Sequence, residues 1–158
     1  MTTVTHLRVN LGSGRYRLDG WTNVDLDHPA DISGDFRDLA FHDLDELNMS
    51  HVLEHISWRE TVPLLTQLRG WMRPRGILTI EVPDMTAILK RGTSDPHWLK
   101  CVYGDQSTRG EYHQAGFSSV SLCDAVTDAG WTVIDLDEFI SDHPGREGMP
   151  CVKVWATA

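Results

Sequence analysis

The sequence contains few of the features that mark membrane proteins, disulfide-bonded proteins or zinc knuckles. Its three cysteines, Cys101, Cys123 and Cys151, are far apart and form no C-x-x-C pair, so neither a disulfide framework nor a zinc knuckle is expected. No apolar run approaches the ~20 residues that a membrane span needs, and residues 1–10 contain no basic segment followed by an apolar one. We therefore expect a cytoplasmic protein that does not associate with a membrane.

Positive charge is also scarce. The 158 residues include 14 Lys and Arg against 23 Asp and Glu, a formal net charge of −9. A surface of this sign repels polyanions, so we do not expect a nucleic acid partner. No repeat, low-complexity tract or linker divides the chain, and its length is typical of one domain. We expect a single domain over residues 1–158, as a monomer or a homodimer.

Segments with strand and helix patterns alternate along the chain. Strands are expected at residues 7–11, 21–26, 30–33, 44–50, 77–82, 131–136 and 152–156, and helices at 58–72, from 95 onward and at 119–129. This alternation predicts an α/β domain, a Rossmann-like and mostly parallel sheet of about seven strands with helices on both faces. The connections after the first two strands are short, and only about one helical turn fits between those strands.

A glycine-rich turn follows the first expected strand. Gly12, Ser13 and Gly14 would let a ligand lie against the backbone, and Asp25, at the end of the second strand, could accept hydrogen bonds from ribose hydroxyls. A dinucleotide fingerprint requires a third glycine where this chain has Arg17, followed by a full helix. The pattern therefore favours an adenosine ligand that has no pyrophosphate.

Five ordered segments resemble the small class I S-adenosylmethionine-dependent methyltransferases. They are LRVNLGSG at 7–14, LDGWTNVD at 18–25, the acidic segment at 35–41, SHVLEH at 50–55 and LRGWMRPRGIL at 68–78. Residues 103–104 and 113–117 are similar, less specifically, to the acceptor side of the family. The resemblance implies binding of S-adenosylmethionine and methyl transfer to an acceptor, a sugar, another small molecule or a macromolecule, that the sequence does not identify.

The resemblance also implies roles for individual residues. Gly12, Ser13 and Gly14 would line the methionine and ribose parts of the cofactor. The other cofactor contacts implied are Asp25 with Leu26 at the ribose, Asp35 with Phe36 at the adenine, and Ser50 with His51 beside the sulfur. The acceptor would enter over residues 50–55, 83–85 and 103–117. The family pattern usually has glycine where this chain has Arg75, and the connections after the first two strands are shorter than usual.

The histidines leave several interpretations open. His51, His55 and His113 are candidate bases for removing a proton from a hydroxyl acceptor, although each could instead have only a structural or solvent-exposed role. Residues 51–55 also match the H-x-x-E-H motif of inverted zinc proteases, but zinc would require a third ligand and a continuous helix. We therefore expect no metal site. A zinc hydrolase that uses His51, Glu54 and His55, and a catalytically inactive cofactor-binding module, remain the alternatives.

Overall fold

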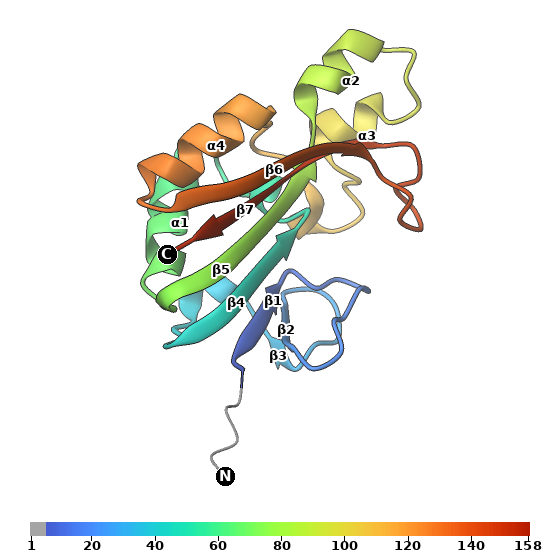
Figure 1. Ribbon diagram of the computed structural model, residues 1–158. Helices are drawn as coiled ribbons and strands as arrows, with labels where there is room; N and C mark the ends of the chain where they lie inside the picture. Colours follow the sequence, from blue (N-terminus) through green and yellow to red (C-terminus); the bar gives the residue numbers. More distant parts are fainter. Residues whose placement is uncertain (1–5) are drawn as a thin grey trace.

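The computed structural model describes residues 6–158, so the expected domain is described from residue 6 onward. Seven strands form one sheet in the order β3-β2-β1-β4-β5-β7-β6 (Figure 1). They are β1 (Arg8–Leu11), β2 (Thr22–Asp25), β3 (Ile32–Ser33), β4 (Leu44–Ser50), β5 (Met72–Pro83), β6 (Thr132–Ile140) and β7 (Pro150–Thr157). The first five are parallel, whereas β7 is antiparallel to both β5 and β6. This confirms the predicted Rossmann-like sheet, which is mixed because of the terminal hairpin.

Four α-helices and three 3₁₀ turns connect the strands. The helices are α1 (Thr61–Arg69), α2 (Met85–Arg91), α3 (Trp98–Tyr103) and α4 (Ser119–Asp128), and the turns are η1 (Phe36–Asp38), η2 (Leu53–His55) and η3 (Arg109–Glu111). The sequence pattern did not predict α2. Asp84 caps its N-terminus by accepting hydrogen bonds from the backbone N–H groups of Thr86 and Ala87. Within residues 6–158, no helix is long and apolar enough to cross a bilayer.

Two of the helices, α1 and α4, lie side by side on one face of the sheet (Figure 1). Their buried apolar side chains pack against those of β1, β4, β5 and β7 in one continuous core. The helical contributors are Leu64, Leu65, Leu68, Leu122 and Val126, and the strand contributors include Val9, Leu11, Leu47, Leu78, Ile80 and Val154. This face supplies the main hydrophobic stabilisation of the domain.

The opposite face has less helical cover, so the expected helices on both faces are present but unequal. Burial alternates along β5, where Leu78 and Ile80 are buried but Thr79 and Glu81 are only partly buried. No helix occurs between β1 and β2 or between β2 and β3, because these connections are too short for a crossover helix. Only α2 and α3 reach this face, at its carboxyl end, where they pack in a small cluster that includes Cys151.

A row of asparagine side chains takes the place of helices over β4, β1 and β2. Asn10 pairs in register with Asn23 and Asn48 on the two neighbouring strands. Its Nδ2 donates to Asn23 Oδ1 at 3.0 Å, and its Oδ1 accepts from Asn48 Nδ2 at 2.8 Å. The β1–β2 connection folds back over this row, since the N–H of Leu18 donates to Asn23 Oδ1 at 2.8 Å. Buried amides and a loop therefore join these parallel strands on the face that lacks helices.

The asparagine row should make a graded contribution to stability. Asn23→Ala removes the acceptor for Asn10 Nδ2 and the Leu18 N–H and the donor to the carbonyls of Leu18 and Trp21, so it should lower the free energy of unfolding by about 2–4 kcal/mol. Asn48→Ala removes a single partly buried bond and should cost only about 1 kcal/mol. Urea titrations of the two variants measure both values. Equal losses would show that the row does not hold β1 and β2 together.

Candidate functional site

The glycine turn after β1 and the carboxylate that ends β2 face each other. Gly12 and Gly14 have φ values of +60° and +52°, in the left-handed region that favours glycine. The N–H of Ser13 donates to the carbonyl of Val24 at 3.0 Å, and the N–H of Gly14 donates to Asp25 Oδ2 at 2.7 Å. The predicted pairing of the glycine turn with Asp25 is therefore present.

Asp25 also organises the turn that follows its own strand. Its Oδ1 accepts from the backbone N–H groups of Asp27 at 2.9 Å and His28 at 2.7 Å. Burial raises the pKa of Asp25, but the hydrogen bonds from Gly14, His28 and Asp27 lower it further than burial raises it. Asp25 is thus a carboxylate at neutral pH, held in position from two sides.

The glycine turn is open on one side and closed on the other. A Cβ built on Gly14, or on Gly34 after the neighbouring strand β3, meets no atom within 4 Å. A Cβ built on Gly12 would lie 2.4 Å from Val52 Cγ2. Ser13 is buried, and its hydroxyl has no hydrogen-bond partner. Beside this turn the Leu26 side chain is 57% exposed, which leaves apolar surface next to the carboxylate of β2. A polar, hydroxyl-bearing ligand with one flat apolar face fits these surroundings.

The acidic segment after β3 offers less to a ligand than expected. The carboxylate of Asp35 is engaged by the guanidinium of Arg37, with Nη2 to Oδ2 at 2.6 Å and Nε to Oδ1 at 2.9 Å. Phe36 is buried in the core, so its ring is not on an open surface where adenine was expected to lie. In this segment, adenine could contact the backbone. It could contact the Asp35 carboxylate only if the ion pair with Arg37 were broken.

Two distant segments reach the carboxyl ends of β1 and β2. In the loop before η3, the hydroxyl of Thr108 donates to Asp27 Oδ2 at 2.9 Å, and Gly110 lies next to the Leu26 side chain. The hydroxyl of Tyr16 donates to the carbonyl of Pro144 in the β6–β7 hairpin at 2.7 Å. Ligands of doubly wound sheets bind at the carboxyl ends of the strands, so these segments surround the expected site.

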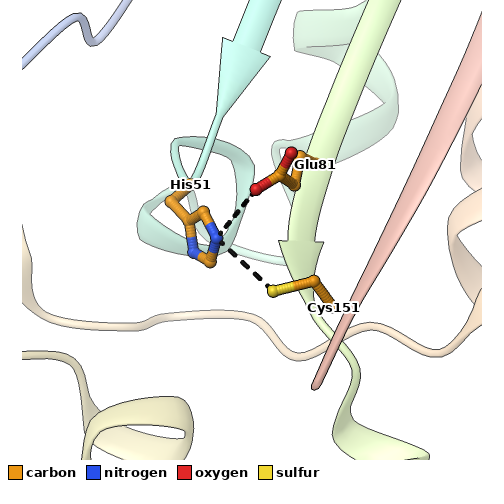
Figure 2. Close-up of side chains that lie close together, drawn as sticks. All are labelled: His51, Glu81 and Cys151. Atoms are coloured by element: carbon orange, nitrogen blue, oxygen red, sulfur yellow. Dashed lines mark hydrogen bonds and ion pairs between the residues drawn. The ribbon is translucent and has the colours of Figure 1, made fainter. Parts of the chain in front are cut away.

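His51, directly after β4, belongs to a buried ionic cluster (Figure 2). Its φ is +55°, and its Nδ1 lies 3.1 Å from Glu54 Oε1. Its Nε2 lies 3.4 Å from Glu81 Oε1 and 3.7 Å from Cys151 Sγ. Lys153 Nζ completes the cluster at 2.7 Å from Glu81 Oε2. The sequence pattern did not identify Glu81 as a site residue, although a carboxylate in the apolar strand 77–82 was a signal.

The charges in this cluster balance. Burial lowers the pKa of His51, but its contacts with Cys151, Glu54 and Glu81 raise it to about 10. Burial raises the pKa of Glu81, while His51 and Lys153 lower it to about 2. With this pKa His51 is an imidazolium at neutral pH, which does not favour its predicted role as a base, and that role stays a prediction. Ser50, which precedes it, is partly buried at the end of β4.

The other two candidate histidines meet in a different place. The rings of His55 and His113 are 4.7 Å apart, edge to face. His113 Nδ1 lies 2.9 Å from the carbonyl oxygen of Cys101, and burial lowers the pKa of His113. The H-x-x-E-H segment is not one α-helix, since it runs from the left-handed His51 into the turn η2. Its two histidines thus enter separate clusters, and the helical zinc-protease arrangement is not formed.

A cavity of about 440 Å³ opens beside His113. Its lining includes Trp58, Met85, Cys101, Val102, Gln114, Ala115 and Gly116. The segments at 83–85 and 103–117, which were expected on the acceptor side, therefore meet around one space. The cavity is large enough for a small organic molecule.

Comparison with known proteins gives relatives by structure alone. No family model and no curated protein matches the sequence. An S-adenosylmethionine-dependent methyltransferase from Methanosarcina mazei has a TM-score of 0.65 at 15% identity, over 94% of this chain and 90% of that one. One from Mesorhizobium loti has a TM-score of 0.64 at 17% identity, over 100% and 94% of the two chains.

A third similar structure contains ligands. The 1,6-didemethyltoxoflavin-N1-methyltransferase of Burkholderia thailandensis, crystallised with 1,6-didemethyltoxoflavin and S-adenosylhomocysteine, has a TM-score of 0.63 at 16% identity, over 96% of this chain and 71% of that one. At such identities the likeness defines the architecture. This chain has the fold of the class I S-adenosylmethionine-dependent methyltransferases, as its sequence motifs indicated.

The buried ionic cluster should make stability depend on acid. The pKa of Glu81 falls from about 4.5 in the unfolded chain to about 2 in the folded one, so its contribution is complete above pH 4.5 and is lost as the pH falls toward 2. Glu81→Gln should cost up to about 3 kcal/mol near pH 6 and much less near pH 3. Urea titrations at both pH values test this.

The exposed Glu138, on the edge strand β6, supplies the control. Glu138→Gln should leave the free energy of unfolding within about 0.5 kcal/mol of wild type at both pH values. A loss in Glu81→Gln that does not change between pH 6 and pH 3 would contradict the charged state assigned to Glu81.

Proposed function

We propose that the protein is an S-adenosylmethionine-dependent methyltransferase that acts on a small molecule, for example a sugar. The observation that carries the proposal is the carboxylate of Asp25, which faces the glycine turn in a class I methyltransferase fold. In this fold the two elements lie at the carboxyl edge of the sheet, where a nucleoside can contact both.

The chemistry of the site favours a cofactor without phosphate. No helix starts at the glycine turn, so the helix N-terminus that normally holds a pyrophosphate is missing from the described chain. Asp25 also places negative charge where a pyrophosphate would lie. A sulfonium cofactor carries a positive charge and suffers no such repulsion.

Asp25 retains the capacity to bind hydroxyl groups. A carboxylate offers about four lone-pair directions, and Oδ2 accepts only one hydrogen bond, from Gly14. A ribose hydroxyl can add to this oxygen without displacing the backbone. The exposed side chain of Leu26 would then lie beside the sugar or the adenine, and Ser13 and Gly14 beside the ribose and methionine part.

The cavity beside His113 is the proposed acceptor pocket. Methyl transfer from a sulfonium is an in-line displacement, so the protein must mainly align the acceptor with the methyl group. Burial keeps His113 neutral, and a neutral imidazole can accept the proton of a hydroxyl acceptor. The similar structures include a 1,6-didemethyltoxoflavin-N1-methyltransferase and a glycopeptide N-methyltransferase, so the fold does not select an acceptor.

The environment and assembly state complete the proposal. The acidic balance of the chain, with a formal net charge of −9, supports a partner other than nucleic acid. We propose that the protein works in the cytoplasm as a monomer or a homodimer.

The cofactor assignment predicts a measurable affinity. Isothermal titration calorimetry should give a dissociation constant in the micromolar range, about −8 kcal/mol, for S-adenosylmethionine or S-adenosylhomocysteine. Asp25→Ala should weaken binding by more than about tenfold because the ribose loses a charged acceptor. Asp19→Ala, at an exposed loop position after the glycine turn, should bind like wild type. The absence of binding to wild-type protein would refute the proposal.

An inactive cofactor-binding module is the second candidate, because the fold alone does not require turnover. Wild-type protein incubated with S-adenosylmethionine and a panel of small hydroxylated and amino acceptors should produce S-adenosylhomocysteine. His113→Ala should reduce that rate by about 10²-fold for a hydroxyl acceptor and leave cofactor affinity unchanged. Cofactor binding without turnover on any acceptor would favour the inactive module.

A further inference from the structure

We propose that Glu54, His55 and His113 form a binding site for a divalent transition metal, with zinc as the best match. One potential ligand atom from each side chain lies within 4.8 Å of the other two. Two imidazoles and one carboxylate are a donor set that zinc and the neighbouring first-row metals prefer. This proposal revises the sequence-based expectation of no metal site, and it goes beyond the proposed methyl transfer. A metal-bound His113 is a ligand and not a base, so the role of His113 as the base of methyl transfer belongs to the metal-free protein.

Both histidines are oriented by backbone carbonyls in the manner of metal ligands. His55 Nδ1 lies 3.3 Å from the carbonyl oxygen of Tyr112, and His113 Nδ1 lies 2.9 Å from that of Cys101. When Nδ1 carries the proton and donates to such a carbonyl, the lone pair is on Nε2. Each ring therefore keeps one nitrogen free to bind a cation.

Glu54 supplies the independent sign that a cation belongs here. Its side chain is 2% exposed, and Oε2 has no hydrogen-bond partner. The nearest cationic group, His51 Nδ1, is 3.1 Å from the other oxygen, Oε1. A buried carboxylate oxygen without a partner is costly, and a metal ion bound to it would remove that cost. The two histidines beside it are the ligands that such an ion would need.

The backbone holds the two halves of the site together. The carbonyl of Glu54 accepts hydrogen bonds from the N–H groups of Gln114 at 2.8 Å and Ala115 at 3.1 Å. The side-chain amide of Gln114 donates to the carbonyl of His55 at 2.8 Å. The segment that carries His113 is therefore fixed to the turn η2 that carries the other two ligands.

Three protein ligands leave one coordination position open, as in catalytic zinc sites. His113 also lines the cavity of about 440 Å³, so a small molecule in that space would lie beside one of the three proposed ligands. A hydroxyl, carboxylate or water oxygen would occupy that position. The substrate class is thus a small molecule with an oxygen donor.

The second group of potential ligands, His51, Glu81 and Cys151, is a poorer site. Lys153 Nζ already lies 2.7 Å from Glu81 Oε2, and both ring nitrogens of His51 face polar partners, Glu54 on one side and Glu81 with Cys151 on the other. A divalent ion there would be repelled by the ammonium group of Lys153. The geometry therefore assigns the metal to Glu54, His55 and His113.

Titration with Co²⁺, in the absence of S-adenosylmethionine, tests the assignment. Purified protein stripped with a chelator should bind one Co²⁺ per chain, with visible ligand-field bands that stoichiometric Zn²⁺ abolishes. His55→Ala and His113→Ala should each weaken Co²⁺ binding by more than about tenfold. His42→Ala, at an exposed histidine, should bind like wild type, and circular dichroism confirms that each variant is folded.

Two outcomes would overturn the proposal. One is the lack of saturable Co²⁺ binding by wild-type protein, or binding that both histidine variants retain. The other is a near-ultraviolet thiolate-to-cobalt band that disappears in Cys151→Ser, which would place the metal in the other cluster. Calorimetry with S-adenosylmethionine on the same samples reports the cofactor site separately, so failure of one proposal is distinguishable from failure of the other.

Discussion

Parallel pairing of β1, β2 and β3 without crossover helices is the constraint on which the rest of this structure depends. Parallel neighbours normally gain cover from the helix that joins them. Here loops connect β1 to β2 and β2 to β3. The side-chain amides of Asn10, Asn23 and Asn48 form hydrogen bonds between strands on the face that these connections leave without a helix. One result is that the glycine turn and Asp25 have a structural role as well as a place in the candidate site, because they also tie β1 to β2.

The segment that follows β4 divides its side chains between two clusters. The left-handed backbone at His51 turns its ring toward Glu81 and Cys151, while η2 carries His55 toward His113. Glu54 lies between the two groups and serves both. Residues 51–55 therefore contribute to two groups. His51 belongs to the buried ionic cluster with Glu81, and His55 packs against His113, which lines the cavity.

The sequence predicted the parts of the fold that depend on local pattern. The strands at 7–11, 44–50 and 152–156 and the helix at 119–129 were found with small shifts at their ends. The pairing of Asp25 with the glycine turn also followed from their order along the chain. By contrast, α2 was missed because its signal is the Asp84 cap rather than an apolar period. The short connections were predicted, but their consequence, that helices cover the second sheet face only at its carboxyl end, was not.

Side-chain roles at the site could not be read from residue type alone, since each depends on tertiary neighbours. His51 and His113 look alike in the sequence, yet contacts with two carboxylates raise the pKa of one, and burial without a close anionic partner at hydrogen-bond distance lowers that of the other. Phe36 likewise depends on its tertiary neighbours, because its ring packs among the buried apolar side chains of the core. The opposite pKa shifts of these two histidines therefore depend on the carboxylates within reach, which are set by how the end of β4 lies beside β5 and β7.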